Sequence, residues 1–484
     1  MNYKTMGRII SQILALEAIF MLPSLIISLC DGAMRTTRAF GYGIFIALAV
    51  SGVLTLLCRR APKGFYAKEG LFCVGISWVV MSLIGCLPFW ISGEIPSFID
   101  AFFEMVSGFS TTGASILNDV EKLSRGVLYW RSFSHWLGGM GVLVFLLALV
   151  PSGRDGGGFT LHLLRAESPG PNVGKLVPRM RRTASILYFM YILLTVLNVL
   201  FLLLGDMPWF DAVCTALGTA GTGGFGIRND SIAGYSPYIQ NVCTVFMLLF
   251  GVNFNCFYWL ILRQFRPVLK NEELRLYILT FVVSTGLIAW NTVSYFKSVG
   301  MAIQQSAFQV ASIMTTTGYS TTDFNMWPGL SKAIILCLMA VGACAGSTGG
   351  GLKYARVILL LKSLRRNIKR LLHPQNIQTI RADGQTVNEK VIDATNIYLV
   401  TYVFIIVFSF LLVAFDGFSI ETNISAVISC FNNIGPGFGD VGPLGNFGGF
   451  SAFSKLVLIV DMLAGRLEIF PILVLFSRRT WNNG

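Results

Sequence analysis

Apolar runs long enough to cross a lipid bilayer recur along the whole chain. A helix needs roughly 18 to 20 mostly apolar residues to cross. Runs near or above that length cover about residues 8–30, 41–58, 71–92, 128–150, 183–204, 237–262, 276–296, 330–361, 392–415 and 453–476. Helices are expected to do the crossing, because lipid offers no partner for unpaired backbone groups. A membrane barrel would need alternating segments of about 10 residues instead, and the sequence lacks them. The pattern predicts an all-α integral membrane protein.

Shorter apolar segments lie between the later pairs of spans. They cover residues 98–109, 209–217, 302–314 and 420–431, which is too short to cross the bilayer but long enough to enter it and return. Each is followed by a turn that contains glycine and then by a long span. This unit of span, half-helix, loop and span recurs four times, and such internal repetition governs the fold. We expect four pseudo-repeats around one pore, preceded by two extra transmembrane helices.

These repeats divide the chain into seven parts. The leading helices occupy residues 1–68, and the four repeats occupy residues 69–150, 183–265, 266–372 and 392–484. The linkers between repeats one and two and between repeats three and four cover residues 151–182 and 373–391.

Composition and charge support a multi-pass membrane protein. Of 484 residues, 13% are charged, whereas soluble domains carry about 25%. The net charge of +13 does not indicate nucleic-acid binding, because the basic residues fall in short loops between apolar runs. Such loops are typically cytoplasmic, so membrane lipid is the expected environment and residues 151–182 and 362–390 are expected inside the cell.

The glycine turns are expected on the opposite, outward side, in loops that also carry acidic residues. An acidic mouth would raise the cation concentration at the entrance. The acids in question are Asp119, Glu121, Asp206, Asp230, Asp323, Asp416, Glu421 and Asp440.

The glycine turns themselves suit a cation pathway. Glycine permits the dihedral angles that point successive carbonyls one way, and rings of backbone carbonyls replace the hydration shell of potassium in selective pores. The preceding half-helix would aim its negative end at the ion. In the second turn Gly223 and Gly224 both fit, and Gly224 is favoured because Gly224-Phe225 parallels Gly318-Tyr319. The four turns are Thr111-Thr112-Gly113, Thr222-Gly223-Gly224, Thr316-Thr317-Gly318 and Asn433-Ile434-Gly435.

Longer strings around the turns resemble the Trk/Ktr/HKT superfamily of potassium transporters, and within it the membrane subunit of the bacterial Trk branch. These strings run from Tyr129 to Gly141, from Ala343 to Lys353 and from Asn432 to Gly437. The resemblance covers almost the whole chain, and the two leading spans fit the Trk branch. Turns two and four depart from the usual hydroxyl-rich pattern, which leaves the register of the filter open there.

The resemblance implies potassium uptake through a gated, channel-like pore. Potassium would be the substrate, held at the twelve turn residues, one glycine per repeat setting selectivity. It also implies a homodimer and a cytoplasmic regulatory subunit that binds a nucleotide (ATP, ADP or NAD). This chain is expected to carry no cofactor, because no glycine loop follows a strand and opens a helix as a phosphate site requires. A proton- or sodium-coupled potassium symporter on the same scaffold is the alternative.

A glycine-rich run and a buried arginine are the expected gate. Glycine costs about 1 kcal/mol relative to alanine inside a helix, so Gly346-Ser347-Thr348-Gly349-Gly350-Gly351 should break the span at 330–361. The resemblance implies that this run forms an intramembrane loop that obstructs the pore under the filter.

Arg466 lies in the last span, where a charge costs at least roughly 2.5 to 3.5 kcal/mol and needs a partner. The resemblance makes it an electrostatic barrier below the filter. A buried ion pair with Glu468 or Asp461 is the alternative. Lys353 admits the same two interpretations, and the structural one is favoured.

Other polar residues in the spans do not indicate catalysis or proton transfer. His135 is interpreted as a hydrogen-bonded packing residue, and Glu17 as a helix contact outside the pore units. A hydrolase or transferase would need His135, Asp461 and Glu468 beside a nucleophile, yet they lie in different units without a motif. We therefore expect a transport protein and not an enzyme.

Overall fold

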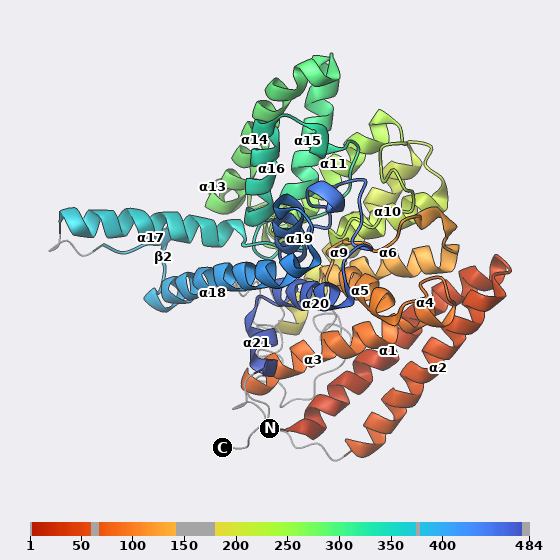
Figure 1. The fold of residues 1–484 in the computed structure, drawn as a ribbon. Coiled ribbons are helices and arrows are strands. Elements are labelled where there is room, and N and C mark those ends of the chain that lie inside the picture. The colour runs from red at the N-terminus through yellow and green to blue at the C-terminus, as the bar shows by residue number, and fades with distance from the viewer. Residues whose placement is uncertain (1, 60–66, 142–179, 374–377, 477–484) are drawn as a thin grey trace.

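The computed structural model describes residues 2–59, 67–141, 180–373 and 378–476, and this part of the chain is helical almost throughout (Figure 1). Its strands are β1 (Arg381–Ala382) and β2 (Gln385–Thr386), which form one antiparallel hairpin. Six helices in the described ranges are long and apolar enough to cross a membrane, or seven if one bent pair is counted as a span. The predicted all-α membrane fold is confirmed.

The two leading helices form an antiparallel pair beside the rest of the molecule. α1 (Tyr3–Cys30) packs along α2 (Met34–Leu57), and α1 also contacts α3 and α6 of the first repeat. Hydroxyl groups join the pair, because Ser11 Oγ lies 2.6 Å from Thr55 Oγ1 and donates to the Ser51 carbonyl at 3.0 Å. The expected spans at 8–30 and 41–58 are therefore helices that begin a few residues early.

Four similar sets of helices follow. The short apolar segments are the helices α5 (Phe98–Phe109), α10 (Trp209–Gly221), α15 (Val299–Met314) and α19 (Ile420–Asn432), here called the pore helices. The spans before them are α3 (Ala67–Gly85) with α4 (Leu87–Ile91), α9 (Met180–Leu203), α14 (Glu272–Phe296) and α18 (Glu389–Val413). After them come α6 (Arg125–Gly139), α11 (Pro237–Gly251) with α12 (Phe254–Ile261) and α13 (Phe265–Lys270), α16 (Gly329–Val341) with α17 (Tyr354–Leu372), and α20 (Ala452–Arg466) with α21 (Phe470–Phe476).

The pore helices are packed in a circle. Each one contacts the helix that follows it in its own repeat and the corresponding helix of the repeat before it: α10 packs on α6, α15 on α11, α19 on α16, and α5 on α20. The last of these contacts joins the fourth repeat to the first. The four sets therefore close a ring, with the C-terminal ends of the pore helices at its centre.

In repeats two and four the second span is broken where the sequence predicted a continuous helix. The expected span at 237–262 bends by 92° between α11 and α12. The expected span at 453–476 is interrupted after Arg466, where Glu468 and Ile469 both have positive φ. The span at 330–361 breaks as expected, but from Gly342 to Lys353, and its second half continues to Leu372. α6 ends at Gly139, and residues 142–150 of the span expected at 128–150 lie outside the described residues.

At two helix ends, after Gly251 and at the end of α6, backbone carbonyls bind partners from other repeats. The carbonyl of Gly251 accepts the amide of Cys344 at 3.1 Å, and the Gly139 carbonyl accepts Arg466 at 2.6 Å. A carbonyl used in this way replaces its helical hydrogen bond with a tertiary one.

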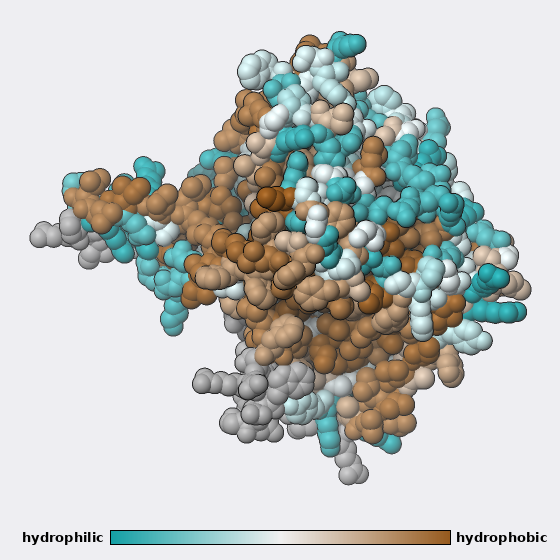
Figure 2. Space-filling model, in the orientation of Figure 1, coloured by the Kyte–Doolittle hydropathy of each residue, from teal (hydrophilic) through white to brown (hydrophobic). Residues whose placement is uncertain are grey.

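The outer surface has the character of a membrane protein. Figure 2 shows hydrophobic residues over α18 and the neighbouring helices, and hydrophilic residues gathered toward the upper right of the view. On α18 the exposed large residues include Phe404, Phe408 and Leu411. Apolar residues that face outward on a spanning helix are expected where lipid is the solvent.

One packing contact tests how the leading helices are attached. A Cβ added at Gly126 of α6 would overlap Ser28 Oγ and lie 2.8 Å from the Ser24 carbonyl oxygen of α1. We expect Gly126→Leu to push α1 away and to lower the melting temperature of the purified protein in detergent. Gly286→Leu on α14 is the control, because a Cβ there meets nothing within 4 Å. Equal melting temperatures for the two variants would contradict this packing.

Candidate ion pathway

The four glycine turns adopt one backbone conformation despite their different sequences. The pore helix ends in a left-handed residue, whose φ is 58° at Thr111, 53° at Thr222, 57° at Thr316 and 55° at Asn433. Two residues later comes a glycine with φ between 74° and 103°, namely Gly113, Gly224, Gly318 and Gly435. Such angles suit glycine because it has no Cβ. The repeated pair of positive φ values marks corresponding positions in the four turns.

The turns also share a hydrogen-bonded helix cap. The residue after the left-handed one donates its amide to the carbonyl five residues back, at 2.9 Å from Thr112 to Ser107 and at 2.8 Å from Thr317 to Ser312. Gly223 and Ile434 make the equivalent bonds at 2.9 and 3.0 Å. This is the Schellman pattern, which satisfies carbonyls at a helix end. The second turn thus has the same register as the others, with Gly224 at the glycine position.

Each of the four glycines lies against a carbonyl of the next turn. A Cβ on Gly113, Gly224 and Gly318 would overlap the carbonyl oxygens of Gly223, Thr317 and Ile434 respectively. A Cβ on Gly435 would lie 2.9 Å from the carbonyl oxygen of Thr112. The contacts pass from repeat one to two, three and four, and then back to one. The turns therefore form a closed ring of backbone with no room for a side chain at the glycine positions.

A cavity of about 200 Å³ opens on one side of this ring, and all four glycines line it. None of the eight acids predicted for the mouth is itself a lining residue, but Asp119, Asp230 and Asp440 each adjoin in sequence a residue that lines the cavity. Its polar lining includes Arg131, Arg228 and Asn229. Asp119 is engaged nearby: Asn229 donates to its carboxylate at 2.9 Å, and this hydrogen bond holds the pKa of Asp119 below its usual range.

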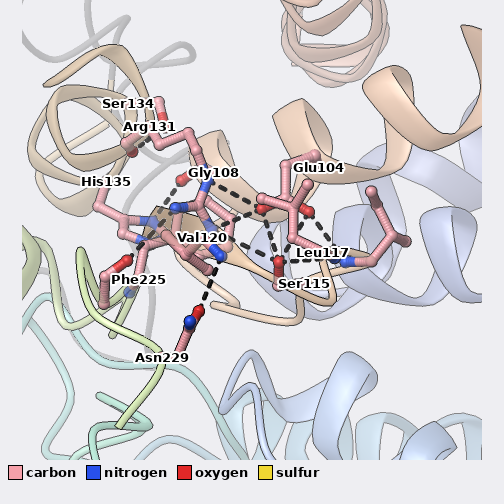
Figure 3. A network of polar contacts seen from close by, with 12 residues as sticks. Glu104, Gly108, Ser115, Leu117, Val120, Arg131, Ser134, His135, Phe225 and Asn229 are labelled. Atoms are coloured by element: carbon pink, nitrogen blue, oxygen red, sulfur yellow. Dashed lines mark hydrogen bonds and ion pairs between the residues drawn. The ribbon is translucent and has the colours of Figure 1, made fainter. Parts of the chain in front are cut away.

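A buried ion pair joins the first turn to the second (Figure 3). Arg131 of α6 donates to Glu104 of α5 at 2.7 and 2.9 Å, and both side chains are almost fully buried. The same carboxylate accepts the Ser115 hydroxyl at 2.9 Å. The guanidinium lies 4.1 Å from the centre of the Phe225 ring and donates to the Gly226 carbonyl at 3.3 Å. The pair thus holds residues that follow both glycines.

His135 packs against the second turn and binds its backbone. Its Nδ1 lies 2.7 Å from the Gly108 carbonyl oxygen, and its Nε2 accepts the amide of Phe225 at 3.3 Å. A Cβ on Gly223 would overlap the imidazole ring. Both ring nitrogens are therefore engaged with backbone, as expected of a packing residue.

The glycine-rich run lies on the other side of the ring from the cavity. The amide of Gly350 donates to Thr316 Oγ1 at 2.7 Å, and the Thr348 hydroxyl donates to the Phe250 carbonyl at 3.3 Å. A Cβ on Gly349 would lie 2.8 Å from the carbonyl oxygen of Thr315. These partners precede the ring glycines, whereas the cavity is lined by residues that follow them. The run from Gly342 to Lys353 is called the intramembrane loop below.

Arg466 is bound to the intramembrane loop and to the first repeat. Its Nη1 donates to the Thr348 carbonyl at 2.7 Å, and its Nη2 donates to the carbonyls of Gly138 and Gly139. The carboxylates proposed as its alternative partners are engaged elsewhere. Glu468 forms an ion pair with Arg356 of α17, and Asp461 accepts the Ser409 hydroxyl at 2.7 Å.

Lys353 is buried, at 2% exposure, and its amine donates to the carbonyl of Gly349. Lys353 and Arg466 both donate to carbonyls of the intramembrane loop, so two basic side chains lie directly beneath the ring.

The sequence did not single out the Glu104–Arg131 pair or the Asn433 side chain. Asn433 Nδ2 donates to Thr112 Oγ1 at 3.0 Å and to the Met462 carbonyl at 2.9 Å, which ties turn four to turn one. Glu104 carried a usable signal, because an acid inside an apolar segment at membrane depth must have a partner. Which residue pairs with Glu104 depends on how α5 packs on α6.

The described residues contain no group of three or more His, Cys, Asp or Glu side chains placed to hold a metal ion. His135, Asp461 and Glu468, which an enzyme would have needed together, contact Gly108, Ser409 and Arg356 instead.

Comparisons with known proteins give the same picture over the full length. The family model TrkH, described as a cation transport protein, matches residues 36–482. The Trk system potassium uptake protein TrkH of Salmonella typhimurium is 35% identical over 491 residues, covering 99% of this chain and 100% of that protein. The Trk system potassium uptake protein TrkG of Escherichia coli K12 is 31% identical over 475 residues, covering 97% and 96%.

A solved structure agrees with the fold. The crystal structure of the potassium transporter TrkH from Vibrio parahaemolyticus superposes with a TM-score of 0.89 at 31% sequence identity, and each chain is covered completely. Sequence and structure match from end to end, and the chain belongs to the TrkH family of cation transport proteins.

Proposed function

We propose that this protein takes up potassium across the bacterial inner membrane through the ring of glycine turns. The single observation that carries the proposal is the closed ring, in which four backbone segments meet and exclude side chains. Such a ring can replace the hydration shell of a potassium ion with carbonyl oxygens. The relatives named above are potassium uptake proteins. The filter would consist of Thr111, Thr112, Gly113, Thr222, Gly223, Gly224, Thr316, Thr317, Gly318, Asn433, Ile434 and Gly435.

The intramembrane loop would be the gate, formed by Gly346, Ser347, Thr348, Gly349, Gly350 and Gly351 with Arg466. The loop contacts the ends of pore helices three and four, where an ion leaving the filter would emerge. Arg466 places a positive charge beneath the ring, and a fixed charge there opposes the passage of a cation. Movement of the loop together with the Arg466 guanidinium would open the pathway.

The remaining parts of the proposal concern orientation and assembly. Positive loops favour the cytoplasm, so the segment 362–390 would face inward and the cavity above the ring would face outward. Residues 151–182, the other basic linker, lie almost entirely outside the described residues. The relatives belong to a Trk system by name. We infer a homodimer whose basic cytoplasmic segments bind a nucleotide-binding regulatory subunit.

Uptake through such a pore needs no coupling ion. The membrane potential supplies about 2.3 kcal/mol per charge per 100 mV. A symporter driven by protons would need a relay of titratable groups across the membrane, and His135 is engaged with backbone on both nitrogens. Channel-like uptake is therefore the function that the geometry supports best.

The filter assignment predicts a change in selectivity. Gly113→Ser and Gly318→Ser should each add atoms where a carbonyl of the next turn lies, distort the ring and shift the permeability ratio toward sodium. Flux of potassium and sodium into proteoliposomes measures this ratio. Gly286→Ser is the control, because its site is open. Unchanged ratios in both filter variants would remove the basis of the assignment.

The gate assignment predicts a leak. Arg466→Ala removes the positive charge and the hydrogen bond to Thr348, so basal potassium flux without a regulatory subunit should rise. A lower flux in properly folded protein would contradict the barrier role. Lys122→Ala is a control, since this exposed lysine pairs with neighbouring Asp119 at 3.1 Å and does not contact the intramembrane loop in the described part of the chain.

The buried ion pair predicts a stability effect that depends on which partner is removed. Arg131→Met leaves Glu104 buried without its counter-charge and should cost about 3 to 5 kcal/mol. Replacing both residues with Met should cost less than Arg131→Met alone, because no charge is then stranded. Thermal unfolding of the single and double variants in detergent measures the difference. A double variant less stable than Arg131→Met would contradict the view that the cost comes from the unpaired charge of Glu104.

A further inference from the structure

Glu273, in the first turn of α14, binds residues on both sides of the glycine-rich run Gly346–Gly351. Its Oε1 accepts the amide of Ala345 at 2.6 Å and the amide of Ala355 at 3.0 Å. Ala345 lies just before the glycine-rich run, and Ala355 lies in the first turn of α17 just after it. The side chain is 7% exposed. A single carboxylate oxygen thus bridges the two sides of the glycine-rich run.

This contact differs in kind from the others that hold the loop. Arg466, Lys353 and Thr316 each bind one backbone group within the run. Glu273 instead accepts from both flanks, and hydrogen bonds to an ionised acceptor are stronger than neutral ones. Without it, two amides would lose their partner at a depth where water is scarce. Backbone hydrogen bonds from Lys353 to the Val341 carbonyl at 2.8 Å and from Tyr354 to the Ala343 carbonyl at 3.2 Å also join the ends of the loop. Glu273 adds the ionised acceptor that binds amides on both sides of the glycine-rich run.

The first turn of α14 is also bound to the β1–β2 hairpin. The carboxylate of Asp383, in the hairpin turn, accepts the amide of Glu272 at 2.9 Å and the side-chain amide of Asn271 at 3.1 Å. Lys362 of α17 forms an ion pair with Glu272 and donates to the Arg381 carbonyl at 2.7 Å. Glu273 therefore follows directly after two residues that the hairpin and α17 hold in place.

The surface around this hairpin is basic. Figure 1 shows α17 projecting from the body of the molecule, with the hairpin beneath it. Asp383 is itself exposed, and exposed basic residues lie on α17, on the hairpin and at the start of α18, namely Arg365, Lys369, Arg370, Arg381 and Lys390. A partner with an acidic surface would be attracted to this region and would compete for the residues that flank Asp383.

We propose that Glu273 is the clasp that keeps the intramembrane loop closed, and that an acidic partner bound at the β1–β2 hairpin releases it by displacing Asp383 from the first turn of α14. The inference rests on the proposed role of the loop as the gate. The inference adds that Glu273 links the cytoplasmic surface to the gate. It also gives a direction: when Asp383 leaves the first turn of α14, the hold of Glu273 on the loop is loosened.

Two variants of similar shape test the clasp. Glu273→Gln keeps a carbonyl oxygen that can accept both amides, whereas Glu273→Met keeps the length of the side chain and loses the acceptor. Basal potassium flux in proteoliposomes should rise on the order of tenfold for Met, since a charge-assisted hydrogen bond is worth roughly that factor or more. The rise should be smaller for Gln, which loses the charge but keeps the acceptor. The potassium-to-sodium permeability ratio should stay at the wild-type value. General damage to the fold would change this ratio as well as the flux.

Glu94→Met is the matched control. Glu94 also accepts several hydrogen bonds, from the Ser124 amide at 2.9 Å and from the hydroxyls of Ser124 and Thr36 at 2.7 Å, but it lies among the leading helices and the first repeat. Its replacement should affect stability without raising basal flux. A leak from Glu94→Met equal to that from Glu273→Met would overturn the clasp.

Asp383→Asn tests the link between the hairpin and the first turn of α14. Because Asp383 is exposed, this variant should fold even if Glu273→Met does not, so the inference can still be tested. We expect a smaller rise in basal flux than for Glu273→Met, and no further rise when both changes are combined, since both act on the first turn of α14. Unchanged flux in Asp383→Asn would overturn the link to the hairpin.

Arg466→Ala separates this inference from the proposed gate. If Arg466→Ala leaks and Glu273→Met does not, the clasp is wrong and the gate stands. If neither leaks, the loop is not the gate and both proposals fall.

Discussion

The structure depends on one constraint, which is that irregular backbone at membrane depth must find its hydrogen-bond partners within the protein. Four pore helices end near the centre of the molecule, and each end would leave carbonyls unpaired. The shared cap resolves this by turning the chain through a left-handed residue, so that the next amide bonds back to the helix. The chain can then run across the helix end with its carbonyls free for another partner. A ring of such segments has the chemistry that a dehydrated cation requires.

The same constraint explains why the second spans are broken. A continuous helix would satisfy its own backbone, but it would supply nothing to the neighbouring repeats. The break after Gly251 gives a carbonyl to the intramembrane loop, and the end of α6 gives two carbonyls to Arg466. The loop in turn has its amides bound by Thr316 and Glu273. The loop and the turns that it supports are therefore joined in one network of hydrogen bonds. A change in the loop would alter the hydrogen bonds of Gly251, Thr316 and Glu273, which lie in three other parts of the chain.

How far the sequence predicts this structure depends on whether a feature is local. The pore helix at 98–109 was predicted with its observed ends, because a polar boundary precedes it and a glycine turn follows it. The register of the second turn was favoured at Gly224 and agrees with the observed backbone. Breaks at Val252 and Leu467 were missed, since no run of glycines marks them and their partners come from other repeats. The Glu104–Arg131 pair and the clasp at Glu273 were missed for the same reason, because neither partner is close in sequence.

The four turns show how one backbone can be kept with unequal side chains. In turns one and three a hydroxyl pair spans the bend, with Ser110 and Thr112 2.7 Å apart and Thr315 and Thr317 at the same distance. Turn two has no hydroxyl at the equivalent position, and the His135 ring fills the space against Gly223 instead.

Turn four uses amide and serine groups for the same purpose. Asn433 takes the left-handed position, as asparagine tolerates it better than most residues, and its side chain reaches across to Thr112. The Ser429 hydroxyl donates to the Gly435 carbonyl at 2.7 Å, whereas Ser312, at the corresponding position of repeat three, donates to the Tyr319 carbonyl at 2.6 Å. The walls of the ring are therefore alike in backbone shape and unlike in the side-chain hydrogen bonds that hold them.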